Sequence, residues 1–112
     1  MELETKVLSR ELQQRMYDNG LTIGTAESCT GGRVAEAVIA TPGASKYFKG
    51  GVICYSNEVK ENLLGVSAQV LAEQSAVSEE VAIQMVKGAC ETLKTDYTVA
   101  VTGYAGPVAG EN

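Results

Sequence analysis

The chain has 112 residues, a hydrophobic fraction of 45% and a formal net charge of -5, which suits one small soluble domain with a single core. Its basic residues are dispersed, which excludes a phosphate track for nucleic acid, and no apolar run approaches the roughly 20 residues of a membrane-spanning helix. The three cysteines lie far apart without CxxC spacing, so we expect reduced thiols in a cytoplasmic protein and no zinc site.

The first half of the chain alternates helical and strand patterns. Apolar residues at helical spacing predict an amphipathic helix over residues 2–19, which Gly20 ends. A short β-branched strand is expected over residues 21–26. A helix should then follow over about 32–40, and Pro42-Gly43 closes it, because the residue before a proline disfavours the helical region.

The middle of the chain is less regular. Residues 44–48 fit either a helical turn or a loop, and Gly50-Gly51 indicates a sharp bend. The continuous apolar run over residues 52–55 is typical of a strand that is buried on both faces. A short helix should follow over residues 58–64, with Ser56 or Asn57 as its N-cap.

The last part of the chain predicts a small helical turn over residues 68–73 and a longer helix that Ser78 opens. A third strand is expected over residues 97–102, followed by a glycine-rich turn. Few strands and a loop-like end indicate a domain of residues 1–112 that is truncated at its C-terminus.

This order of elements predicts an α/β protein, a three-layer α/β/α sandwich with a mostly parallel, mixed sheet. Ligands of such sheets bind outside the carboxyl ends of the strands. All three expected strands end in polar or glycine-rich turns, so we expect these turns to form one pocket. The small sheet also allows a homodimer that buries an edge strand.

The turn over residues 25–33 carries a carboxylate, hydroxyl groups, a thiol and two glycines between a strand and a helix. Free N–H groups at such a turn suit a phosphate or a developing oxyanion. We therefore expect a cradle for one of them, made by the following residues: Ser28, Thr30, Gly31 and Gly32.

Several motifs in one order resemble the C-terminal domain family of competence/damage-inducible protein CinA, which includes the nicotinamide mononucleotide (NMN) amidohydrolases. The resemblance covers residues 21–107, and its motifs are residues 25–32, 42–45, 50–60, 64–66, 76–82 and 102–107. It implies hydrolysis of NMN to nicotinate mononucleotide and ammonia in pyridine-nucleotide salvage, without a cofactor or metal. The sequence departs from the family at Val108-Ala109, which interrupts a run of glycines.

The resemblance also implies three catalytic residues, Ser45, Tyr55 and Lys60. Histidine is absent from the chain, which excludes Ser-His-Asp and Cys-His machinery, so a serine with a lysine base is the natural arrangement for amide hydrolysis. Ser45 would be the nucleophile, Lys60 the base, and Tyr55 would assist proton transfer. Ser28 is the alternative nucleophile, whereas Cys29 has no histidine to pair with and reads as a small packed residue.

The remaining assignments concern the substrate. Glu27 could orient a lysine or the ribose hydroxyls, or it could be the partner of a structural cation. Thr102, Gly103 and Gly106 would line the nucleotide, although an ordinary strand-to-loop turn has the same composition. The alternative function is a nucleotide-binding or interaction domain of a CinA-like protein that does not catalyse.

Overall fold

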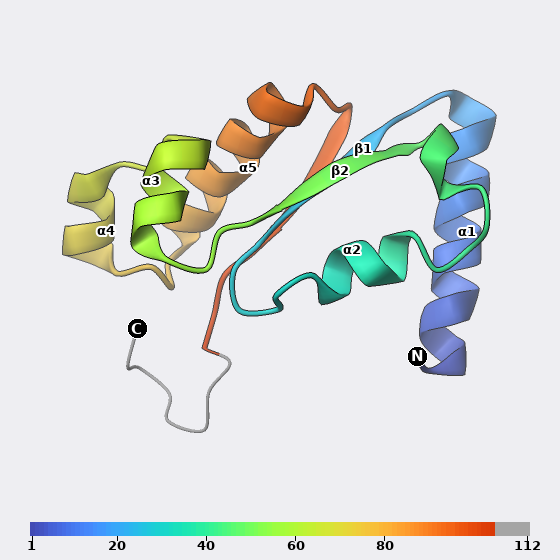
Figure 1. The fold of residues 1–112 in the computed structure, drawn as a ribbon, viewed down its shortest axis with the longest axis horizontal. Helices are drawn as coiled ribbons and strands as arrows, with labels where there is room; N and C mark the ends of the chain where they lie inside the picture. Colours follow the sequence, from blue (N-terminus) through green and yellow to red (C-terminus); the bar gives the residue numbers. More distant parts are fainter. Residues whose placement is uncertain (105–112) are drawn as a thin grey trace.

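A parallel three-stranded sheet forms the centre of the protein. In this computed structural model, which describes residues 1–104, β1 (Ile23–Glu27) lies between β2 (Phe48–Ile53) and β3 (Tyr97–Val101) (Figure 1). Both neighbours run parallel to β1, in a register that pairs Glu27 with Ile53 and with Val101. The carboxyl ends of all three strands therefore meet at one edge, and the predicted α/β class is confirmed.

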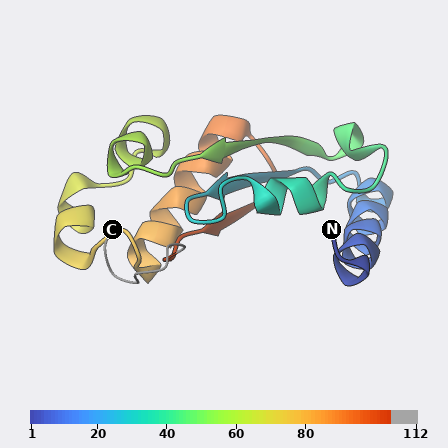
Figure 2. The same ribbon diagram turned by 60° about the horizontal axis from the view of Figure 1, so that its bottom comes forward.

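The helices form two groups. Figures 1 and 2 show α1 (Leu3–Asn19) and α2 (Arg33–Val38) on one side of the molecule. On the other side lie α3 (Asn57–Leu64), α4 (Ala68–Gln74) and α5 (Glu79–Leu93). None of the helices within residues 1–104 is long and apolar enough to cross a membrane.

Each group of helices has its own apolar core against β1, whose five residues are all buried. Side chains alternate along a strand, so Ile23 and Ala26 point to opposite faces. Ile23 packs with Met16, Val38 and Tyr47. Ala26 belongs to the larger cluster, which comprises Cys54, Leu64, Val66, Leu71, Ala76, Val81, Met85 and Ala89.

Serine N-caps fix where the helices of the second group begin. The hydroxyls of Ser56, Ser67 and Ser78 accept hydrogen bonds from the N–H groups three residues later. Such a cap satisfies a backbone donor that has no partner inside the helix. The predicted caps Ser56 and Ser78 are confirmed, and the start of α3 places Lys60 in the first turns of that helix.

The prediction for β2 was wrong in two respects. The strand includes Gly50 and Gly51, which we expected to form a bend, and it ends before Cys54 and Tyr55. Its residues alternate in exposure because β2 is an edge strand, so the run is not buried on both faces. Gly51 is required within the strand, since a Cβ there would collide with the Thr25 hydroxyl on β1.

Candidate active site

Lys60 is the most unusual side chain at the carboxyl edge of the sheet. Only 1% of its surface is exposed, although lysine is rarely buried. Its Nζ donates to the Cys54 carbonyl at 2.8 Å, the Tyr55 carbonyl at 3.1 Å and the Ser28 Oγ at 3.0 Å. The loop between β2 and α3 thus folds around the amine and directs it at the serine that follows β1.

Ser28 is held in place by its backbone. Its N–H donates to the Val101 carbonyl at 3.0 Å, which ties the residue to the end of β3. Its side chain is buried and lies between the turn that follows β1 and the amine of Lys60. The two groups come from residues 32 positions apart, so the parallel sheet itself creates the pair.

The environment of this pair shifts Lys60 toward its neutral form. Burial lowers the pKa of Lys60 below its ordinary value, and the Cys54 and Cys29 thiols oppose that shift more weakly. All three hydrogen-bond partners of Nζ are uncharged oxygens. In its neutral form the amine can still donate to both carbonyls, and its contact with Ser28 can reverse, so that its lone pair accepts the hydroxyl proton. The pair has the composition of a nucleophile with an adjacent base.

The pair opens into a cavity of about 270 Å³ at the carboxyl edge of the sheet. The cavity is built from all three strand-ending turns and from the segment before α5. Its lining comprises Ser28, Cys29, Tyr55, Ser56, Asn57, Lys60, Ala76, Val77, Thr102 and Gly103. The turns that the sequence placed at one edge therefore do meet in one pocket.

The side chain of Glu27 does not line this cavity. It is 1% exposed, and its carboxylate accepts hydrogen bonds from the turn after β1 and from the start of α2. The donors are the Thr30 hydroxyl at 2.6 Å and the backbone N–H groups of Gly32, Val34 and Ala35 at 3.2, 2.8 and 2.9 Å. Burial by itself would raise the pKa of Glu27, but these hydrogen bonds outweigh burial and lower it.

Of the four residues expected to form the phosphate or oxyanion cradle, all but Ser28 donate hydrogen bonds within the turn that follows β1. The Thr30 hydroxyl and the Gly32 N–H donate to Glu27, and the Gly31 N–H donates to the Ser28 carbonyl at 3.2 Å. Gly31 and Gly32 have φ of 59° and 111°, so they shape the turn rather than present it to a ligand. Thr30, Gly31 and Gly32 are not among the residues that line the cavity, whereas Ser28 is.

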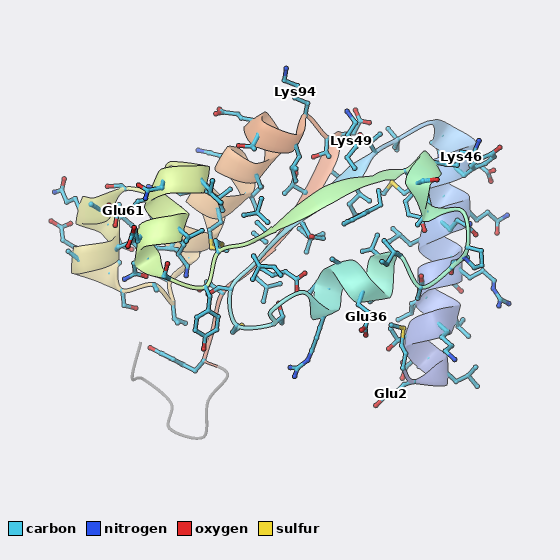
Figure 3. The ribbon with its side chains drawn as sticks, viewed as in Figure 1. Glu2, Glu36, Lys46, Lys49, Glu61 and Lys94 are labelled. Atoms are coloured by element: carbon cyan, nitrogen blue, oxygen red, sulfur yellow. The ribbon has the colours of Figure 1, made fainter. Side chains whose placement is uncertain are left out.

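Ser45 lies at the opposite end of the sheet from Lys60. It is exposed and sits in the short 3-10 helix Ala44–Lys46, before β2, whereas Tyr55 and Lys60 follow that strand. A six-residue strand spans about 20 Å. Figure 3 labels the neighbours of the two residues, with Lys46 beside α1 and Glu61 on α3. The arrangement within this chain thus brings Ser28, and not Ser45, to Lys60.

The other expected residues divide between the cavity and the rest of the chain. Tyr55 lines the cavity with 64% of its side chain exposed, and its carbonyl holds Lys60. Thr102 and Gly103 also line it, but the Thr102 hydroxyl donates to the Ala76 carbonyl at 2.8 Å. Gly106 lies outside the described residues.

Sequence reasoning missed part of the lining. Asn57 was expected in the turn that follows the second strand, but no role in the site was assigned to it, although it lines the cavity. Ala76 and Val77 were expected only as part of a family motif. Ala76 and Val77 carry no chemical signal and reach the cavity only through the packing of α4 and α5. Within residues 1–104, no group of three His, Cys, Asp or Glu side chains is placed to hold a metal ion.

The fold and the cavity define an α/β protein with a buried serine–lysine pair at the carboxyl edge of a parallel sheet. The family model described as "CinA C-terminal domain" matches residues 5–112, and the chain belongs to this family. In structure it is similar to the competence damage-inducible protein A from Klebsiella pneumoniae, with a TM-score of 0.92 and 40% identity. That match covers 96% of this chain and 66% of the other.

Two curated relatives illustrate how the family varies in length. A "CinA-like protein" from Leptospira borgpetersenii is 47% identical over 106 residues, which cover 95% of this chain and 25% of that protein. The "Nicotinamide-nucleotide amidohydrolase PncC" of Escherichia coli (strain K12) is 42% identical over 107 residues, 96% of this chain and 65% of that protein. The chain thus spans a quarter of the first relative and about two thirds of the second.

Proposed function

We propose that this protein is an amidohydrolase that converts NMN to nicotinate mononucleotide and ammonia, in pyridine-nucleotide salvage. The observation that carries the proposal is the buried contact between Lys60 Nζ and Ser28 Oγ at 3.0 Å inside a cavity. The name of the Escherichia coli relative, a nicotinamide-nucleotide amidohydrolase, supplies the substrate class.

In the proposed mechanism Ser28 is the nucleophile and Lys60 the base. Lys60 takes the hydroxyl proton as Ser28 Oγ attacks the carboxamide carbon, and it returns this proton to the departing nitrogen, which leaves as ammonia. Water then attacks the acyl-serine in the same way and releases the carboxylate. Neutral Lys60 is the active form, which agrees with the lowering of its pKa by burial.

The oxyanion of the tetrahedral intermediate needs a hydrogen-bond donor near Ser28. Within residues 1–104, the Cys29 N–H has no hydrogen-bond acceptor, unlike those of Gly31 and Gly32. Cys29 also lines the cavity. We assign its N–H to the oxyanion, and its thiol to packing.

The size of the cavity suggests which part of the substrate it holds. A volume of about 270 Å³ is small beside the roughly 300–1,000 Å³ of typical ligand pockets. It suits the nicotinamide ring and its carboxamide better than the whole nucleotide. Tyr55 stands at the exposed side of the cavity, where its hydroxyl can assist transfer of a proton to the leaving group.

The test is ammonia release from NMN by the wild-type protein and by Lys60→Met. Lys49→Met is the matched control, because Lys49 is an exposed lysine on β2 whose Nζ donates to the Lys94 carbonyl. The proposal predicts ammonia release by the wild type and the control, and a rate lower by about 100-fold or more for Lys60→Met. NMN binding without ammonia release by the wild type would favour the non-catalytic alternative.

A further inference from the structure

Glu27 is hydrogen-bonded both to the turn that follows the nucleophile and to the segment that holds the base. Its side chain holds the turn that follows Ser28, through Thr30 and Gly32, as well as the first turn of α2. Its backbone carbonyl accepts the Cys54 N–H at 2.8 Å. The carbonyl of Cys54 in turn accepts a hydrogen bond from Lys60. One residue thus connects to both members of the catalytic pair without touching the cavity.

The turn that carries Ser28 has few other supports. The Ser28 N–H is bound to β3, and the Gly31 N–H closes the turn onto the Ser28 carbonyl. Gly31 and Gly32 supply no side chains, and both have positive φ, so they resist little displacement of the turn. The carboxylate replaces the missing side-chain packing, because the turn and the start of α2 wrap around its two oxygens.

We propose that Glu27 is a positioning residue of the active site, whose ionised carboxylate sets Ser28 Oγ within reach of Lys60 Nζ. This role differs from the substrate contact that the sequence suggested, because the carboxylate is buried away from the cavity. The activity part of the test rests on the proposed function. A displacement of about 1 Å at a reacting group can cost on the order of 100-fold in rate.

Glu27→Gln is the informative variant because it preserves shape. The amide oxygen can replace Oε1 as acceptor, but the amide nitrogen then faces the Ala35 N–H, so two donors oppose each other. Glu36→Gln is the matched control, since Glu36 is an exposed carboxylate in the first turn of the same helix, labelled in Figure 3.

Two measurements separate positioning from simple helix capping. The first is the steady-state kinetics of NMN hydrolysis, for which we expect Glu27→Gln to lower kcat by about 10- to 100-fold and leave KM within twofold. The second needs no NMN and measures how fast a fluorophosphonate probe labels Ser28. We expect labelling of Glu27→Gln to fall in parallel with kcat, while Glu36→Gln matches the wild type in both measurements.

Wild-type kcat and labelling in a folded Glu27→Gln protein with a lower Tm would overturn the proposal and leave Glu27 as a helix cap. Absence of Ser28 labelling in the wild type would also overturn it. If the wild type is labelled but does not hydrolyse NMN, the proposed function fails while the labelling comparison still decides this inference. If Glu27→Gln does not fold, Thr30→Val removes one donor to the carboxylate, and unchanged labelling in that variant contradicts the proposal.

Discussion

Replacing Lys60 with methionine tests the catalytic pair most sharply, because methionine fills the buried space without an amine. The change removes the base and three hydrogen bonds, to Ser28, Cys54 and Tyr55. Loss of a positioned base slows a reaction by about 10²- to 10⁴-fold. At 1.36 kcal/mol for each tenfold, this corresponds to about 3–5 kcal/mol of transition-state stabilisation.

The same change has a smaller effect on stability. Unpaired buried carbonyl oxygens cost about 1–3 kcal/mol each, but removing a buried amine recovers part of that cost. We expect Lys60→Met to fold with a Tm lower by several degrees, since about 1 kcal/mol shifts Tm by roughly 4–8 °C in a domain of this size. Ammonia release is measured beside Lys49→Met. Turnover within threefold of the wild type in folded Lys60→Met would refute the role of Lys60 as base.

The pH dependence of stability, compared between the wild type and Lys60→Met, tests whether the pKa of Lys60 is lowered, because the direction of the change is predicted. An ordinary lysine has a pKa of about 10.4, and burial lowers that of Lys60 in the folded protein. Between the folded and unfolded pKa values the unfolded chain binds more protons, so stability rises with pH in that window and its gain is absent below the folded pKa. In urea unfolding, the stability of the wild type relative to Lys60→Met should therefore rise with pH through that window. A stability difference between the two proteins that is independent of pH would contradict a lowered pKa.

Four further substitutions distinguish residues of the active site from residues that support the fold. Ser28→Ala should reduce ammonia release by about 10³-fold or more, whereas Ser45→Ala, at the far end of the sheet, should stay within twofold of the wild type. Tyr55→Phe should lower kcat about tenfold or more with little change in KM, and unchanged kcat would remove the Tyr55 hydroxyl from the mechanism. Gly88→Ala should destabilise the protein by about 1–3 kcal/mol in urea unfolding, because a Cβ there would collide with the Leu64 carbonyl of α3; an unchanged midpoint would contradict that close contact.

Local patterns in the sequence predicted most of the fold. Ser78 identified the start of α5, and Gly20 identified where α1 ends. The prediction of a bend at Gly50-Gly51 was wrong, because Gly51 is needed where a Cβ would collide with Thr25 on the neighbouring strand. Only the pairing of β2 with β1 reveals this collision, and no pattern within residues 48–53 predicts it.

The candidate site was only partly predictable for a related reason. The expectation that strand-ending turns form the pocket was sufficient to bring Ser28 and Lys60 together. The direction of the strands would also have separated Ser45 from Lys60, since a residue that precedes a parallel strand lies at the amino edge of the sheet, opposite the pocket. The burial of Lys60 was not readable, because a lysine in the first turns of a helix is usually solvated. The sequence also did not predict that the Glu27 carboxylate accepts hydrogen bonds from the backbone, because these bonds depend on the path of the turn that follows Glu27.

Mass spectrometry of the protein quenched during NMN turnover tests whether Ser28 forms a covalent acyl intermediate. We expect a nicotinate mononucleotide acyl group on the peptide that contains Ser28, and its loss in Ser28→Ala. The same group on Ser45 or Cys29, or continued turnover by Ser28→Ala, would show that Ser28 is not the nucleophile.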